Sequence, residues 1–162
     1  MGSSRPEVVI PAENAVFRLD ARGRWCNRHG VFRNRRISEH FHAAIRRDAG
    51  GYHLHQELPD RVEKVYFPYE DTALFVVQVA LGQPVALTLN TGRRFDLEPE
   101  ALFVRGESLY LSLEGERVKF TERAMLKLAE AMEFTDTGYS LRVGGCVHRI
   151  PELQEEAAPC GR

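Results

Sequence analysis

Alternating apolar and polar residues, interrupted by glycine or proline, dominate the chain and predict a series of short β-strands. In chain order, the predicted strands span residues 15–20, 24–27, 52–56, 61–67, 74–81, 85–90, 95–97, 101–105, 108–113, 116–120, 139–143 and 146–150. The run of four from 52–56 to 85–90 is expected to be antiparallel. Two further segments repeat apolar residues at helical spacing, so the pattern predicts an α+β fold of mostly antiparallel strands with two short helices.

The first predicted helix spans about residues 38–47, with Ser38 as its N-cap and Phe41 on its apolar side. The second spans about residues 121–133 and begins after Thr121. A hydroxyl at the N-cap accepts a hydrogen bond from one of the free N–H groups of the first turn. Both helices are therefore expected to begin at these capping residues.

The predicted elements occur in the same order in residues 24–56 and in residues 108–143. Each segment reads as strand, glycine turn, strand, capped helix and a strand that opens with Gly-Tyr. The paired landmarks are Trp25 with Tyr110, Gly30 with Gly115, Ser38 with Thr121, and Gly51-Tyr52-His53-Leu54 with Gly138-Tyr139-Ser140-Leu141. This order predicts an internal duplication of a β-β-α-β unit, although two unrelated units of this kind would give the same pattern.

Composition changes at the two ends of the chain, where glycine, serine, proline or acidic residues replace the alternating pattern. We expect a flexible N-terminal tail over residues 1–13 and a flexible acidic tail over residues 152–162. Between them, the repeat predicts an N-terminal α+β unit over residues 14–72 and a C-terminal α+β unit over residues 73–151.

The composition is that of a globular protein, with 43% hydrophobic and 28% charged residues and a net charge of -1. The charge balance gives no overall attraction to nucleic acid or to an anionic membrane. The longest apolar run, residues 73–81, is too short to cross a bilayer, and residues 1–11 lack a secretory signal pattern. Three scattered cysteines, Cys26, Cys146 and Cys160, form no disulfide framework. These features predict a cytoplasmic protein with reduced thiols.

Positive charge is concentrated near the first predicted helix. Nine arginines lie in this part of the chain: Arg18, Arg22, Arg24, Arg28, Arg33, Arg35, Arg36, Arg46 and Arg47. Arg33, Arg35 and Arg36 directly precede the expected helix start, where guanidinium groups and free backbone N–H groups together favour phosphate. The alternative is a solvated basic surface. Because no aromatic residues alternate with these arginines as they would in a stacking platform, nucleic acid is a disfavoured ligand.

No recognisable catalytic motif occurs in the chain. Glu70 and Asp71 are the best pair of carboxylates for acid-base chemistry, but neighbouring residues leaving a strand diverge. His53 and His55 would share one face of a strand, as metal ligands often do, yet no supporting ligand stands at an obvious position. We therefore predict no catalytic residues, no metal site and no identified cofactor, with an enzyme only as a third hypothesis.

Several strings also occur in an order that resembles a known family. They are Trp25 with Gly30, Arg47-Asp48, Gly51-Tyr52-His53-Leu54, Glu63-Lys64-Val65, Glu70-Asp71, Phe75, Leu89-Asn90-Thr91-Gly92, Phe95-Asp96-Leu97 with Pro99, Phe103-Val104-Arg105-Gly106 and Gly144-Gly145. Over residues 24–150 the chain resembles the bacterial domain-of-unknown-function family 1285. It departs from the family pattern at Leu74, where that pattern has proline before Phe75.

This resemblance implies a duplicated α+β core, a pleckstrin-homology-like C-terminal half and a ligand site where the two halves meet. It implies a non-enzymatic ligand-binding or signalling module for a small anionic, nucleotide-like ligand. The expected ligand-binding residues are Arg33, Arg35, Arg36, Glu63, Lys64, Glu70, Asp71, Asn90 and Arg105. The second hypothesis is an adaptor that holds a protein partner along an exposed strand edge. The third is a hydrolase that uses Glu70, Asp71 or the histidines.

Overall fold

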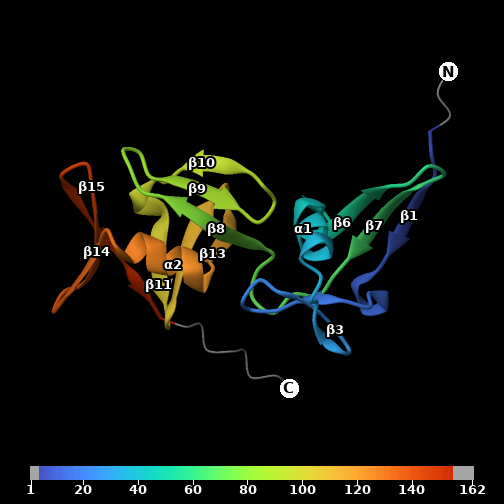
Figure 1. Cartoon of the computed structure of the whole chain (residues 1–162), viewed down its shortest axis with the longest axis horizontal. Coiled ribbons are helices and arrows are strands. Elements are labelled where there is room, and N and C mark those ends of the chain that lie inside the picture. The colour runs from blue at the N-terminus through green and yellow to red at the C-terminus, as the bar shows by residue number, and fades with distance from the viewer. Residues whose placement is uncertain (1–3, 155–162) are drawn as a thin grey trace. The chain divides into compact units, whose positions relative to one another are not determined.

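The computed structural model describes residues 4–154 and divides the chain into two compact units (Figure 1). Unit 1 runs to Ala73 and includes Asn90–Gly92. Unit 2 holds Leu74–Leu89 and the chain from Arg93 onward. Strands outnumber the two α-helices, which confirms the mixed α+β class.

Unit 1 contains two small sheets and one helix. In the first sheet, β1 pairs with β7 in parallel, while β7 with β6 and β6 with β5 are antiparallel. These strands are β1 (Glu7–Ile10), β5 (Ile45–Asp48), β6 (Gly51–Glu57) and β7 (Val62–Tyr66). The second sheet is the antiparallel meander of β2 (Arg18–Leu19), β3 (Trp25–Asn27) and β4 (Gly30–Val31). Helix α1 (Arg35–Ala43) joins the two sheets along the chain, and the 3-10 turn η1 (Ala12–Asn14) links β1 to β2.

Trp25 organises the core of unit 1. Its side chain is 1% exposed and makes edge contacts with Phe17, Phe41 and Phe67 at ring-centroid distances of 4.9–5.7 Å. Aromatic pairs at such distances stabilise a core beyond the area they bury. The short meander therefore stays in place because its tryptophan is packed against α1 and against Phe67, which directly follows β7.

Unit 2 contains a seven-stranded sheet in the order β10-β9-β8-β13-β12-β11-β17 and a three-stranded sheet in the order β14-β15-β16. The large sheet holds β8 (Leu74–Ala80), β9 (Ala86–Leu89), β10 (Arg94–Asp96), β11 (Leu102–Arg105), β12 (Ser108–Leu113), β13 (Glu116–Phe120) and β17 (Glu152–Leu153), with the 3-10 turn η2 (Pro99–Ala101) before β11. The small sheet holds β14 (Met132–Thr135), β15 (Gly138–Val143) and β16 (Cys146–Ile150). Helix α2 (Glu122–Ala129) buries Ala124 and Leu128.

Helix α1 begins earlier and ends earlier than the sequence predicts. Its N-cap is Asn34, not Ser38, and the Asn34 side chain accepts hydrogen bonds from the N–H groups of Arg36 and Ile37. The helix ends at Ala43, because Ile45–Asp48 pairs with β6 and so leaves the helical path. Helical spacing of apolar residues could not show this pairing, which depends on a strand that comes later in the chain.

Helix α2 confirms one prediction and corrects another. Thr121 is the N-cap, as predicted, and its hydroxyl accepts a hydrogen bond from the Ala124 N–H. The helix ends at Ala129, four residues before the expected end at 133. Met132–Thr135 instead pairs with β15, so the apolar Met132 belongs to a strand.

Two expectations about the strands are corrected. The four strands predicted as one antiparallel run form two antiparallel pairs in different sheets, β6 with β7 in unit 1 and β8 with β9 in unit 2. Within the segments predicted as flexible tails, residues 1–3 and 155–162 lie outside the described residues, while β1 and β17 pair in parallel with β7 and β11. Parallel partners far apart in the sequence leave no local turn signal, which explains both errors.

The described cysteines are free, with Cys26 buried and Cys146 exposed, and Cys160 lies outside the described residues. Neither helix within residues 4–154 has the length and apolarity that crossing a bilayer would require.

Candidate functional site

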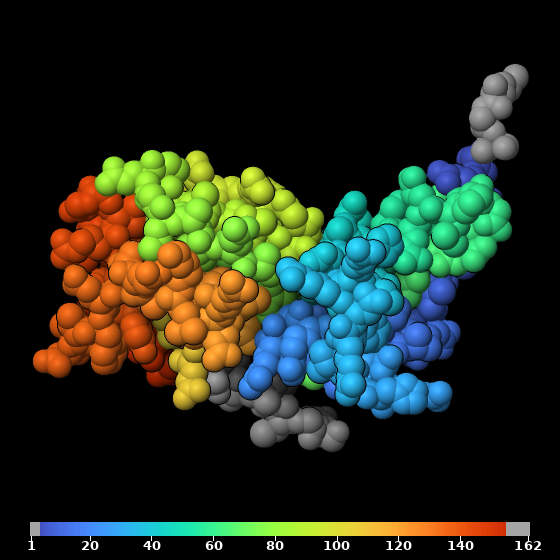
Figure 2. All heavy atoms as spheres, viewed as in Figure 1, coloured from blue at the N-terminus to red at the C-terminus, as the bar shows by residue number. Residues whose placement is uncertain are grey.

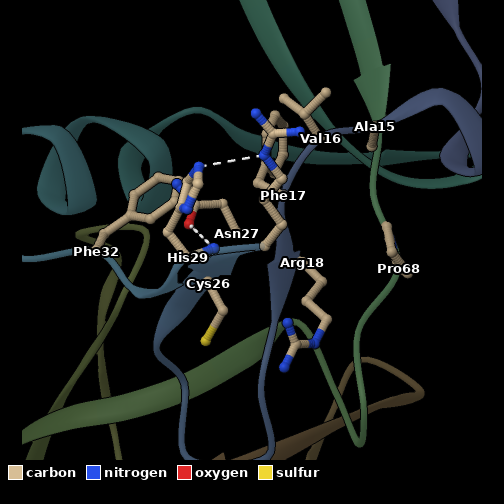
Figure 3. Close-up of a pocket in the computed structure, with 10 residues that line it drawn as sticks. Ala15, Val16, Phe17, Arg18, Cys26, Asn27, His29, Phe32 and Pro68 are labelled. Atoms are coloured by element: carbon tan, nitrogen blue, oxygen red, sulfur yellow. Dashed lines mark hydrogen bonds between the residues drawn. The ribbon is translucent and has the colours of Figure 1, made fainter.

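A cleft of about 630 Å³ lies beside the β2–β3–β4 meander of unit 1 (Figure 3). Its walls come from the segment before β2, from β3, from the turn between β3 and β4, and from Pro68. The residues that line it are Ala15, Val16, Phe17, Arg18, Cys26, Asn27, Arg28, His29, Phe32 and Pro68. None of these residues carries a carboxylate, whereas two carry a guanidinium group.

The floor of the cleft is aromatic. Phe17 and Phe32 are both half-buried, and each packs against Phe41 of α1, with ring centroids 5.0 and 5.6 Å apart. Phe17 also contacts Trp25 edge-on at 5.7 Å. The two rings are therefore held by the core of unit 1 while part of each ring remains open to a ligand.

The turn between β3 and β4 supplies the polar rim. The Nε of Arg28 donates a hydrogen bond to Nε2 of His29 at 3.1 Å, and the His29 N–H donates to Oδ1 of Asn27 at 2.8 Å. Gly30 closes this turn with a φ of +113°, a value that favours glycine. Within residues 4–154 the terminal nitrogens of Arg28 have no hydrogen-bond or ion-pair partner, so they are available to an anion.

A second hollow of about 520 Å³ adjoins the first. It shares Asn27, His29 and Phe32 with the cleft, and adds Val31, Arg33, Asn34 and Ile37. Arg33 is exposed, and its guanidinium group makes no hydrogen bond or ion pair in the described part of the chain. The structure thus brings one predicted ligand residue, Arg33, to the edge of a real hollow.

The other two predicted arginines line neither hollow, although the blue and cyan atoms of their segment lie on the visible face of the space-filling view (Figure 2). Arg35 is paired with Glu39 at 2.8 Å. Arg36 is exposed, but its backbone N–H is bonded to the Asn34 side chain, as is that of Ile37. The start of α1 therefore offers fewer free N–H groups to a phosphate than the sequence alone suggests.

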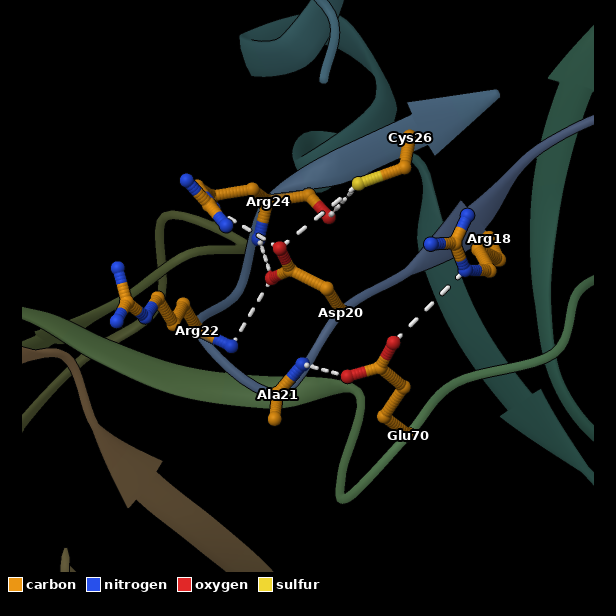
Figure 4. Close-up of polar contacts among 7 residues, drawn as sticks. All are labelled: Arg18, Asp20, Ala21, Arg22, Arg24, Cys26 and Glu70. Atoms are coloured by element: carbon orange, nitrogen blue, oxygen red, sulfur yellow. Dashed lines mark hydrogen bonds and ion pairs between the residues drawn. The ribbon is translucent and has the colours of Figure 1, made fainter. Parts of the chain in front are cut away.

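A third hollow, of about 330 Å³, surrounds a network centred on Asp20 (Figure 4). Oδ1 of Asp20 accepts from the N–H groups of Arg22 and Arg24, and Oδ2 accepts from Nε of Arg24 at 2.8 Å. Burial of Asp20 favours its neutral form, but the hydrogen bonds from Arg24 and Arg22 outweigh burial and lower the pKa of this carboxyl. Asp20 thereby fixes the turn between β2 and β3.

Glu70, predicted to line a ligand site, also supports the β2–β3 turn. Its Oε2 accepts a hydrogen bond from the Ala21 N–H at 2.9 Å, and its Oε1 lies 3.8 Å from Nε of Arg18 (Figure 4). Both contacts tie the segment after β7 to β2. Its neighbour Asp71 is half-buried in the same segment.

Asp48 is the centre of a second polar network, on the β5–β6–β7 sheet. Its carboxylate accepts from Nζ of Lys64 at 3.1 Å, from the Tyr66 hydroxyl at 2.9 Å and from the Gly50 N–H at 2.9 Å. The bond from Lys64, followed by that from Tyr66, lowers the pKa of Asp48 to about 2. Nδ1 of the buried His53 lies 3.8 Å away. A Cβ on Gly50 would meet the Tyr66 hydroxyl oxygen at 2.7 Å.

Two residues that the sequence predicts as ligands, Lys64 and Glu63, therefore already have partners within unit 1. Lys64 bridges Asp48 and Glu7, with Nζ 3.6 Å from the Glu7 carboxylate. Glu63 is paired with Nε of Arg61 at 2.8 Å. These charges hold strands together, and neither residue lines the three hollows described above.

Asn90 and Arg105 have separate surroundings. Nδ2 of Asn90 donates to the Ala73 carbonyl at 3.0 Å and lies 3.3 Å from Nδ1 of His42, which also accepts from Nε1 of Trp25 at 3.2 Å. Burial lowers the pKa of His42 to about 4, against the opposing charge of Glu39. Arg105 belongs to unit 2, on β11, and its buried Nε has no hydrogen-bond partner among the described residues.

The histidines do not form a metal centre in the part of the chain that the structure describes, because no three histidine, cysteine or carboxylate side chains gather there. His53 is buried beside Asp48, and Nε2 of His55 lies 3.8 Å from a Glu57 oxygen.

Sequence reasoning missed Phe17, Arg28 and His29, three of the residues that line the cleft. A signal for two of them exists, since the Asn27-Arg28-His29-Gly30 string is a tight turn between two short strands and carries a guanidinium group and an imidazole. Its importance becomes visible only when the meander places that turn beside the rings of Phe17 and Phe32.

No family model matches the chain, and no curated protein is similar enough in sequence to match it. Solved structures do resemble it. A DUF1285 family protein from Silicibacter pomeroyi DSS-3 has a TM-score of 0.57 and 14% identity, covering 91% of this chain and 83% of that chain. Another from Shewanella baltica OS155 has a TM-score of 0.51 and 18% identity, covering 74% and 94%. The chain therefore has the fold of these DUF1285 family proteins, and the resemblance seen in its sequence strings is confirmed at the level of the fold.

Proposed function

We propose that unit 1 binds a small anionic ligand in the cleft beside the β2–β3–β4 meander. The observation that carries this proposal is the composition of the wall, which combines arginines with an aromatic floor and contains no acidic residue. A volume of about 630 Å³ is within the usual range for small-molecule sites. The net charge of the whole chain is only -1, so this attraction is a local property of the cleft.

The residues of the cleft favour a ligand of the nucleotide-like class. A flat ring would lie against Phe17 and Phe32, because aromatic faces stack with nucleobases and similar rings. The terminal nitrogens of Arg28 would bind phosphate or carboxylate oxygens through charge-assisted hydrogen bonds. We infer a binding or signalling role without catalysis, since the polar groups of the rim do not form an acid-base or nucleophile pair.

Binding can be tested by calorimetry and thermal shift with nucleotides and sugar phosphates. A ligand at a hundredfold excess over its Kd stabilises the folded state by about 2.7 kcal/mol. We expect Arg28→Ala to weaken binding about tenfold or more, because a charge-assisted hydrogen bond contributes roughly 1.5–3 kcal/mol. Arg123→Ala is the matched control, since Arg123 is an exposed arginine of α2 that lies outside the cleft. Equal binding by wild type and Arg28→Ala would refute the proposed site.

We further propose that the two units are diverged copies of one β-β-α-β unit. In each, the second strand after the helix donates a backbone hydrogen bond to a carbonyl group just beyond the helix: His55 to Ala44, one residue past the end of α1, and Arg142 to Ala131, two residues past the end of α2, both at 2.9 Å. The strands β6 and β15 also begin with glycines of nearly equal φ, +111° at Gly51 and +115° at Gly138. On this proposal, the large sheet of unit 2 with α2 is the pleckstrin-homology-like part.

A second candidate function is a protein-interaction adaptor, and a feature of unit 2 favours it. Strand β14 is an edge strand of its sheet and carries Phe134, whose side chain contacts Tyr139 with ring centroids 4.8 Å apart and is still 73% exposed. Edge strands with exposed apolar residues are common sites for an added strand. This function would be supported if the variant Phe134→Ser no longer bound a protein partner of the wild type, while ligand binding by unit 1 stayed unchanged.

A further inference from the structure

We infer that the ligand of unit 1 is elongated and carries two anionic groups, one bound at Arg28 in the cleft and the other at Arg33 in the adjoining hollow. This inference rests on the proposed function and extends it. It assigns a second anion subsite to Arg33 and an apolar middle section to the ligand.

The first argument is adjacency. The cleft and the second hollow have Asn27, His29 and Phe32 in common, so the two hollows meet at these residues. The cleft measures about 630 Å³ and the second hollow about 520 Å³. A ligand that contacts both Arg28 and Arg33 has to extend past the shared residues, which favours an extended molecule over a compact anion such as inorganic phosphate.

The second argument is the distribution of charge. Neither the cleft nor the second hollow is lined by an acidic residue among those described, so an anionic ligand meets no repulsion along this path. Arg28 stands on the cleft side and Arg33 on the far side of the shared residues. Both have guanidinium nitrogens without partners in residues 4–154, in contrast to Arg24 and Arg35, which are each paired with a carboxylate at 2.8 Å.

The third argument concerns the middle of the path. Phe32 belongs to both hollows, and Val31 and Ile37, 42% and 45% exposed, continue the apolar surface on the side of Arg33. A section of ligand without charge would cover this surface and gain from its removal from water. The ligand class is therefore an apolar or aromatic body with an anionic group at each end.

The α1 N-terminus does not supply the second subsite. Asn34 also lines the second hollow, yet its side-chain oxygen is occupied by the N–H groups of Arg36 and Ile37. The second anionic group would thus depend on the Arg33 guanidinium, which binds carboxylate and phosphate alike. Removal of the Arg33 side chain is therefore expected to abolish binding at the second subsite and to leave the subsite at Arg28 in place.

The test is an NMR titration with linear α,ω-dicarboxylates, from succinate to sebacate, against the monocarboxylates of equal length. A symmetric diacid binds a single-anion site about twofold better for statistical reasons alone. We expect one length of diacid to bind roughly fivefold to twentyfold tighter than its monoacid, because the second charge-assisted contact is added. Arg33→Ala should return this ratio to about two, because the second charge-assisted contact is then lost.

The controls distinguish the two levels of the proposal. Arg36 is another exposed arginine and lines neither hollow, so Arg36→Ala should keep the full diacid preference, whereas Arg28→Ala should weaken the binding of monoacids and diacids together. A ratio of about two at every length, with monoacid binding that depends on Arg28, would overturn the second subsite and keep the proposed function. Absence of binding by both series, or binding insensitive to Arg28→Ala, would overturn both.

Discussion

Unit 1 holds two groups of charged residues that differ in how their charges are used. Around Asp48, the carboxylate is bonded to Lys64, Tyr66 and Gly50, so each strong donor there has a partner. At the cleft and the adjoining hollow, the terminal nitrogens of Arg28 and the guanidinium group of Arg33 have no partner among residues 4–154. The difference indicates that the first group holds the sheet together and that the second is available to bind another molecule.

The largest expected effect would come from removing the support that both groups share. Trp25→Ala takes a side chain that is 1% exposed out of the core and should lower the free energy of unfolding by about 3–5 kcal/mol. Because Phe17 and Phe41 pack on Trp25, the cleft floor should collapse as well. Urea denaturation with ligand titration measures both losses. A loss of stability with intact ligand binding would show that the cleft does not depend on this core.

Acid should weaken the same core through His42. Its pKa is about 4 in the folded protein and about 6.5 when unfolded, so the unfolded chain binds the extra proton first as the pH falls. The folded state should lose on the order of 2 kcal/mol between pH 7 and pH 5, and the loss should level off below pH 4. Urea titrations of wild type and His42→Gln at these pH values test this. The variant should lack the step, and an equal step in both proteins would assign it to another group.

The Asp48 network should respond in stability and leave ligand binding unchanged. Asp48→Asn removes the charge that Lys64 and Tyr66 bind, so the urea midpoint at pH 7 should fall. The folded pKa of Asp48 is lowered, so its contribution is present above the unfolded pKa near 3.8 and is lost as the pH falls toward about 2. The variant should show a shallower acid transition. Weaker ligand binding by Asp48→Asn would contradict the assignment of the Asp48 group to stability alone.

The smallest effect is expected at Arg35. Its side chain is 89% exposed and its ion pair with Glu39 spans one helical turn, an arrangement that stabilises a helix by about 0.3–0.5 kcal/mol. Arg35→Ala should therefore change thermal stability only slightly and leave anion binding as it is, since Arg35 lines neither hollow. A loss of binding comparable to that of Arg28→Ala would restore the helix start as the anion site.

The parts of the fold that depend on nearby residues could be read from the sequence, and the parts that depend on distant ones could not. The Thr121 cap and the hairpin of β12 and β13 follow from local patterns. The parallel pairing of β1 with β7 does not follow from a local pattern, because more than fifty residues separate the partners and no tight turn connects them. The end of α1 was misplaced for the same reason, since β6 draws Ile45–Asp48 into the sheet.

The charge density of the sequence predicts an anion site in the segment that also carries the hollows, and one of the residues it indicates lines one of them. Arg33 lines a hollow as an exposed arginine, which the charge density of this segment indicates. Arg28 and Phe17 were missed, because alternation alone cannot tell which short strands bring a turn beside an aromatic surface. Lys64, chosen from a family-like string, is instead paired within the Asp48 network.

The close approach of Tyr66 to Gly50 has a consequence for how related sequences can vary. A methyl group at position 50 would stand 2.7 Å from the Tyr66 hydroxyl oxygen, which cannot swing away without losing its bond to Asp48. A larger residue can therefore replace Gly50 only if the residue at position 66 also changes. Homologues with alanine or serine at 50 should have exchanged Tyr66 for a shorter residue, so the two positions should covary while Arg28 and Arg33 vary independently of them.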